Sequence, residues 1–193
     1  MCATFLHTSP LFLHTHFNIL FVMAYKKNPK KKDALNIKRA VESLRFQIDW
    51  GLKLLGAKKG DLFHQLAKVE VDLISELNLT QDILAIKSLV DGVKQNLQIE
   101  PTPESGDFTH SIVALALGIA SISHLNNISL PESWRDQIEK KLLTIYYPEK
   151  LRNKIVDWAK ANGYSTSNYL GRPIVKFNQL YLIIERNGET GRY

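Results

Sequence analysis

The residues of this chain that could take part in chemistry are mainly its cations. The 193 residues include 25 Lys and Arg against 19 Asp and Glu, so the formal net charge is +6 at pH 7. A balance of this size favours an anionic partner, either nucleic acid or an acidic membrane surface, although it can also serve solubility alone. Four of these cations lie in the C-terminal third of the chain: Lys140, Lys141, Arg172 and Lys176.

The sequence lacks the residue spacings that most enzymes and metal sites require. The stretch Gly56–Gly60 has neither the length nor the Lys-Ser/Thr end of a phosphate-binding loop. His110 and His124 flank an apolar stretch without a third metal ligand near them, and Asp72 with Glu76 is an ordinary exposed pair. We therefore predict no catalytic, cofactor-binding or metal-binding residues and do not expect an enzyme.

The first 33 residues differ in composition from the rest of the chain. Cys2 is the single cysteine, so no internal disulfide can form, which favours a reducing, cytoplasmic location. Residues 1–22 carry no Lys, Arg, Asp or Glu, and a lysine run follows them, which is the reverse of a secretory signal. We expect residues 1–33 to be a leader and basic arm, either disordered or not translated before Met23. A membrane anchor at 1–22 is the alternative, and without it we expect no membrane contact.

Hydrophobic periodicity predicts helices through most of the chain before residue 141. Apolar residues at spacings of three and four indicate helices over 34–55, over 62–77 after an N-cap at Asp61, and over 80–97. Residues 100–106 form a Pro-containing linker. A second helical region at 107–140 includes a nearly apolar core helix at 111–125, a loop at 126–130 and a helix begun by Pro131. The predicted fold is therefore mainly α, with a helical bundle before the C-terminal segment.

The C-terminal segment, residues 141–193, has a different pattern. Leu142–Tyr147 is rich in β-branched and aromatic residues and predicts a strand. Pro148 opens an amphipathic helix, Asn162-Gly163 ends it, and Ser165 is a candidate N-cap for a second helix. This order over residues 142–177 resembles the ribbon–helix–helix DNA-binding proteins. The core positions that carry the resemblance are Leu151, Ile155, Ala159, Leu170, Ile174 and Phe177.

The resemblance implies a homodimer that binds DNA and acts as a transcriptional or plasmid regulator. In such a protein two chains pair their single strands, and the resulting ribbon enters the major groove. The residues facing the bases would be Leu142, Thr144 and Tyr146. The start of the second helix, at Ser165 and Thr166, would hold a phosphate. Lys140, Lys141, Arg172 and Lys176 would add positive charge.

Two other interpretations of this segment remain open. Pro173 falls inside the expected second helix, where proline is unfavourable. If the helix ends near Leu170, residues 174–185 become a strand closed by a turn at Asn187-Gly188, and the layout is winged-helix-like. Alternatively, the segment is the C-terminal α/β part of a globular protein. The chain would then be a helical protein-interaction or scaffold module with no nucleic-acid role.

Overall fold

The computed structural model describes residues 33–102, 106–120 and 131–187. Leu35–Tyr193 form one compact unit, and this unit holds the helices and the sheet considered below. The leader, the basic arm and the start at Met23 lie outside the described residues, as do the predicted loop at 126–130 and Gly188 of the predicted turn.

The N-terminal half of the unit consists of the three helices that the periodicity predicts. They are α2 (Asp33–Leu54), α3 (Leu62–Glu76) and α4 (Thr80–Leu97). Asp61 caps α3 as expected, because its Oδ1 accepts the backbone N–H of His64 at 3.1 Å. No helix within 33–102, 106–120 or 131–187 combines the length and hydrophobicity needed to cross a membrane.

The second helical region is more broken than its sequence suggests. It contains a 3-10 turn, η2 (Asp107–His110), a short helix α5 (Ile112–Ala116), and α6 (Pro131–Glu139). Of the predicted core helix at 111–125, residues 112–116 are helical and residues 117–120 are not, while residues 121–125 lie outside the described residues. Gly118 follows α5 with a φ of 72°, in the left-handed region that ends helices. The helix that Pro131 opens is confirmed.

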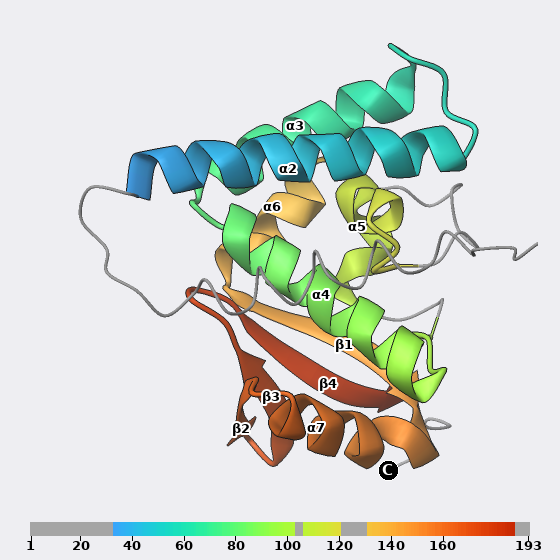
Figure 1. The fold of residues 1–193 in the computed structure, drawn as a ribbon, viewed down its shortest axis with the longest axis vertical. Helices are drawn as coiled ribbons and strands as arrows, with labels where there is room; N and C mark the ends of the chain where they lie inside the picture. The colour runs from blue at the N-terminus through green and yellow to red at the C-terminus, as the bar shows by residue number, and fades with distance from the viewer. Residues whose placement is uncertain (1–32, 103–105, 121–130, 188–193) are drawn as a thin grey trace, which may run out of the picture. The chain divides into compact units, whose positions relative to one another are not determined.

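A four-stranded mixed sheet occupies the C-terminal part of the chain (Figure 1). Its strands are β1 (Leu142–Pro148), β2 (Ser165–Tyr169), β3 (Arg172–Lys176) and β4 (Tyr181–Asn187), in the spatial order β1-β4-β3-β2. β1 and β4 are parallel, whereas the other neighbours are antiparallel. A 3-10 turn, η4 (Glu149–Leu151), and α7 (Arg152–Ala161) connect β1 to β2.

The sheet shows that the predicted fold class is wrong. The expected strand, first helix and Asn162-Gly163 stop are present, but the residues after Ser165 form strand β2 and no second helix. Leu170 and Gly171 both have positive φ, at 48° and 75°, and make the tight turn of a β2–β3 hairpin. Pro173 lies just outside the β3–β4 ladder, which begins at Ile174, so its missing N–H breaks no bond to β4. The segment is neither ribbon–helix–helix nor winged-helix in form.

The free edge of β1 is covered by the chain's own backbone. The N–H of Thr102 donates to the Tyr146 carbonyl oxygen at 2.8 Å, and Gly106 forms a bridge with Ile145. The N–H of Thr144 donates to Asp107 Oδ2 at 2.6 Å. β1 is thus paired on both sides, and a ribbon with a second copy of β1 has no open edge to use.

One face of the sheet, called the inner face here, belongs to the hydrophobic core. Its strand residues are Leu143, Ile145, Tyr147, Val175, Leu182 and Ile184, all at most 2% exposed. α4 and α7 pack against each other at Gly92, where the indole of Trp158 fills the space beside the glycine. Ile174 and Ile183 are buried but stand outside that core cluster, because alternation along each strand turns them to the opposite, outer face.

Candidate nucleic-acid interface

The outer face of the sheet gathers aromatic, cationic and hydroxyl side chains into a small grid. Register and strand alternation place its members in three rows across β1, β4, β3 and β2. In the third row the contact between β4 and β3 is the ion pair of Glu185 with Arg172, because the β3–β4 ladder begins at Ile174. The rows are Leu142, Tyr181, Lys176 and Ser165; then Thr144, Ile183, Ile174 and Ser167; then Tyr146, Glu185, Arg172 and Tyr169.

Most of the site residues predicted from sequence lie on this one face. Leu142, Thr144 and Tyr146 point outward from β1 as expected, and their neighbours across the strands include three further predicted residues: Ser165, Arg172 and Lys176. Lys140 and Lys141 directly precede β1 and are exposed. The four-stranded sheet brings these residues together, and the sequence pattern did not predict that sheet.

Thr166 and the expected phosphate-binding helix end do not belong to this site. Thr166 pairs with Val175, which is fully buried, so its side chain is on the inner face. Ser165 is an exposed strand residue and caps no helix. The predicted phosphate site at the N-terminus of a second helix is therefore wrong, since β2 has no helix dipole to offer.

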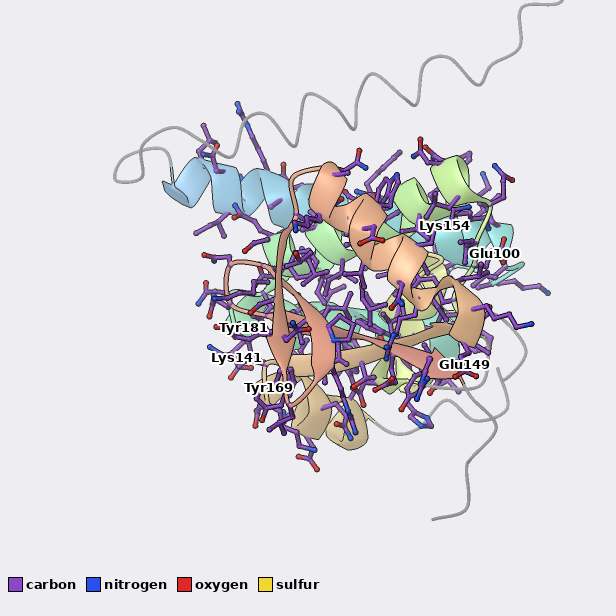
Figure 2. The ribbon with its side chains drawn as sticks, turned by 90° about the horizontal axis from the view of Figure 1, so that it is seen from below. Glu100, Lys141, Glu149, Lys154, Tyr169 and Tyr181 are labelled. Atoms are coloured by element: carbon purple, nitrogen blue, oxygen red, sulfur yellow. The ribbon has the colours of Figure 1, made fainter. Side chains whose placement is uncertain are left out.

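Three tyrosines give the outer face its aromatic character. Tyr169 is 46% exposed and Tyr181 is 39% exposed, while Tyr146 is partly exposed. Figure 2 shows Tyr169 and Tyr181 toward the same side of the molecule as Lys141, with Glu149 and Glu100 toward the other. Tyr169 and Tyr181 were missed from sequence, because no strand was expected at 165–169 and residues 174–185 were expected as a strand only in the winged-helix-like alternative. The available signal was alternation along 181–185, where Tyr, Ile and Glu are separated by buried leucine and isoleucine.

The cations of the outer face are held in defined positions. Lys176 Nζ lies 5.6 Å from the centre of the Tyr181 ring, within cation–π range. Lys141 Nζ donates to Gln179 Oε1 at 3.0 Å and so stays beside the start of β4. Both lysines are exposed, so an anion can approach them.

The single carboxylate among the twelve outer-face residues is neutralised by two guanidinium groups. Glu185 Oε1 lies 3.3 Å from Arg152 Nη1, and Glu185 Oε2 lies 3.3 Å from Arg172 Nε. Its side chain is 15% exposed, whereas that of Arg172 is 56% exposed. Arg172 therefore keeps an open guanidinium edge, and the outer face carries a net positive charge.

Comparison with known proteins does not add to this description. No protein-family model matches the chain, and no curated protein matches it by sequence. Among the described residues no cluster of three or more His, Cys, Asp or Glu side chains is placed to hold a metal ion. The chemistry of the outer face is thus the basis for a functional hypothesis.

Proposed function

We propose that this protein binds single-stranded nucleic acid on the outer face of its sheet. The observation that carries the proposal is the grid in which Tyr146, Tyr169 and Tyr181 alternate with Lys176 and Arg172. Aromatic rings on a sheet stack with unpaired bases, and neighbouring cations contact the phosphates. The hydroxyl groups of Thr144, Ser165 and Ser167 can hydrogen-bond to base edges or sugars.

The width of the sheet favours a single strand over the groove of a duplex. Adjacent strands are about 4.8 Å apart, so the axes of four strands span about 14 Å before side chains are counted. The major groove is about 12 Å wide and accommodates a helix or a two-stranded ribbon. A sheet face that carries three tyrosines suits splayed bases, which have no fixed groove geometry.

The overall charge supports the same proposal. A net charge of +6 raises the local concentration of a polyanion around the whole molecule. We place this activity in the cytoplasm, because a single cysteine suits a reducing compartment. A role in regulating transcription is compatible with binding of this kind, and no catalytic step is assigned.

The test is a fluorescence anisotropy titration with three labelled probes of one sequence: single-stranded DNA, single-stranded RNA and duplex DNA. We expect both single strands to bind more tightly than the duplex, with affinity that falls steeply as salt increases. Equal or tighter binding of the duplex would contradict the single-strand proposal. Absence of binding to all three at low salt would contradict a nucleic-acid role altogether.

A second candidate function, protein interaction by self-association, is favoured by an exposed apolar stripe on α2. Phe46, Trp50 and Leu54 recur every four residues and are 71%, 56% and 72% exposed. They lie on the side of α2 opposite the buried Leu44 and Leu52. Monomeric proteins seldom leave two neighbouring aromatic side chains this open on one helix.

We infer that a second copy of this chain covers the stripe. If two α2 helices pack antiparallel about a two-fold axis midway between Phe46 and Trp50, each phenylalanine meets the indole of the second copy. The same arrangement brings Glu42 toward Lys53 of the second copy. Sedimentation equilibrium should therefore show a dimer that Trp50→Ala weakens and that Leu62→Ala, an exposed apolar change on α3, leaves intact. A wild-type protein that stays monomeric would exclude this candidate.

A further inference from the structure

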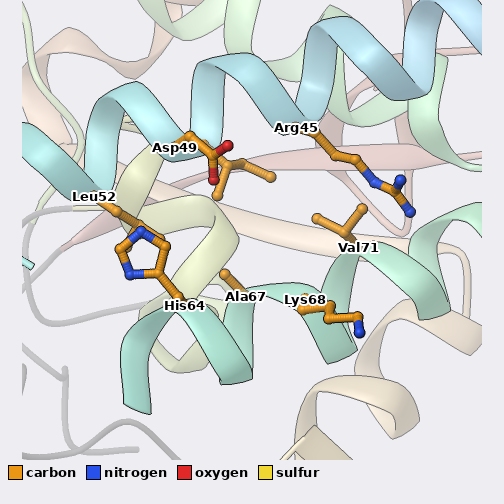
Figure 3. Close-up of a pocket in the computed structure, with 8 residues that line it drawn as sticks. Arg45, Asp49, Leu52, His64, Ala67, Lys68 and Val71 are labelled. Atoms are coloured by element: carbon orange, nitrogen blue, oxygen red, sulfur yellow. The ribbon is translucent and has the colours of Figure 1, made fainter. Parts of the chain in front are cut away.

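A groove of about 310 Å³ lies between α2 and α3, away from the sheet residues discussed above (Figure 3). Its floor is apolar and nearly inaccessible to solvent, with exposures of 1–3%. The floor residues are Ile48, Leu52, Ala67 and Val71. A volume of this size is at the lower end of the range for small-molecule sites, which are typically apolar with a few polar groups at the rim.

The rim of the groove carries two cations, one carboxylate and one imidazole. α2 contributes Arg45 and Asp49, and α3 contributes His64 and Lys68. Arg45 Nη2 lies 3.3 Å from Asp72 Oδ1, an ion pair in which both side chains are more than half exposed. Lys68 makes no ion pair with any residue that the structure describes. The rim thus has one cation in an ion pair, Arg45, and one outside any ion pair among the described residues, Lys68.

His64 is fixed in orientation by the cap of its own helix. Its Nδ1 lies 3.1 Å from Asp61 Oδ1, and its backbone N–H donates to the same oxygen. Burial raises the pKa of Asp61, but hydrogen bonds from the His64 ring, the His64 N–H and the Lys58 N–H together bring it below its ordinary value of 3.8. An ionised Asp61 holds Nδ1 as the donor, so Nε2 is the ring atom left to interact with a ligand.

We propose that this groove binds a small organic monoanion whose apolar body rests on the aliphatic floor. The anionic group, a carboxylate or sulfonate, would sit between Arg45 and Lys68. Asp49, one turn along α2 from Arg45, disfavours a polyanion such as a phosphate chain, and it would accept a hydrogen bond from an N–H or O–H on the ligand. The site is independent of the proposed nucleic-acid interface.

The probe for the test is 8-anilinonaphthalene-1-sulfonate, which has an aromatic body, one sulfonate and one N–H donor. Its fluorescence should rise on titration with the full chain in a saturable, one-site manner. Lys68→Met keeps the side-chain stem but removes the charge, and should weaken binding about tenfold. Lys160→Met, an exposed lysine at the end of α7, is the matched control and should have no effect.

A second measurement guards against non-specific binding of this dye. Backbone amide shifts in NMR spectra should change on α2 and α3 around the groove when the dye is added. Ala67→Leu should block the effect by filling the floor, and its circular dichroism spectrum would show whether the fold is kept. Dye binding that is equally strong in Lys68→Met, or shift changes centred elsewhere, would overturn the proposal.

Discussion

Asp82 on α4 accepts the backbone N–H of Gln179 at 2.8 Å, across 97 positions of sequence. The same carboxylate also accepts the N–H groups of Asn178 and Leu180, at 2.9 Å and 3.1 Å. Asp82 is 1% exposed. This buried side chain therefore fixes the β3–β4 connection, and through it the relative positions of Lys176 and Tyr181 on the outer face.

The first prediction concerns this anchor. Asp82→Ala leaves three backbone N–H groups without their acceptor, so we expect the free energy of unfolding to fall by about 2–4 kcal/mol. Urea denaturation followed by circular dichroism measures the change. Asp136→Ala, at an exposed aspartate on α6, should change the free energy by less than about 0.5 kcal/mol. Equal effects of the two substitutions would show that the Asp82 contacts are unimportant for stability.

The second prediction concerns pH and the buried Glu70 on α3. Its carboxylate accepts the Ser111 hydroxyl at 2.6 Å and the N–H groups of Ile112 and Val113 at 3.0 Å each. Burial nevertheless raises the pKa of Glu70 above its ordinary value of 4.5. A carboxyl with a higher pKa when folded binds more protons in the folded state, so its contribution to stability decreases as pH rises from that ordinary value through the folded pKa.

The variant Glu70→Gln isolates this effect. The difference in free energy of unfolding between wild type and Glu70→Gln should shift in favour of the variant as pH increases above 4.5. Urea titrations at several pH values give that difference directly. Glu42→Gln, at an exposed glutamate of α2, is the control for the loss of one surface charge. A pH-independent difference would mean that the pKa of Glu70 is the same in folded and unfolded chains.

The third prediction compares two glycines at helix contacts. A Cβ at Gly51 would lie 1.8 Å from the carbonyl oxygen of Ala116, whereas a Cβ at Gly92 would lie 2.4 Å from Cη2 of the Trp158 ring. Backbone cannot move aside as a side chain can. Gly51→Ala should therefore destabilise the protein by about 2–4 kcal/mol, and Gly92→Ala by less, because a rotated indole and better helix propensity offset part of the clash. Thermal unfolding of both variants shows which substitution is more destabilising. A larger effect for Gly92→Ala than for Gly51→Ala would contradict the close approach of α2 and α5.

The sequence was sufficient for the elements whose determinants are local. The apolar stripes of α2, α3 and α4, the cap at Asp61 and the alternation of Leu142–Tyr147 each depend on residues a few positions apart. The prediction of a helix after Ser165 was wrong because the structure of Ser165–Tyr169 depends on residues outside this segment. Its polar run after Asn162-Gly163 matches an N-cap, and its extended form depends on pairing with Arg172–Lys176 through a turn where the non-glycine Leu170 has positive φ.

Only the part of the candidate site that lies on β1 could be predicted from the sequence, because β1 shows clear alternation of buried and exposed residues. The outward direction of Thr144 and Tyr146 followed from the alternation in β1, and it is the same in the structure. The partners of β1 could not be predicted, because the parallel pairing with β4 joins residues about 40 positions apart. Tyr169 and Tyr181 consequently became candidates only when the sheet order was known.

The fourth prediction concerns phosphate contact on the outer face. Lys176→Gln removes a cation that lies over the Tyr181 ring. If Lys176 neutralises one phosphate of a bound single strand, the slope of log affinity against log salt should become less steep by about 0.7. Anisotropy titrations at four or more salt concentrations would give the slope. Lys160→Gln, on α7, should leave it unchanged, and an unchanged slope for Lys176→Gln would place the phosphates elsewhere.

The most direct measurement is the affinity of two Tyr181 variants for a labelled single-stranded oligonucleotide. Tyr181→Phe keeps the ring and should bind with an affinity within about twofold of wild type. Tyr181→Ala removes the ring, and with it a stacking free energy of about 1–3 kcal/mol, so it should bind at least about fivefold more weakly. Tyr181 is 39% exposed, so neither substitution should unfold the chain. Wild-type affinity in Tyr181→Ala would contradict binding of single strands on the outer face of the sheet.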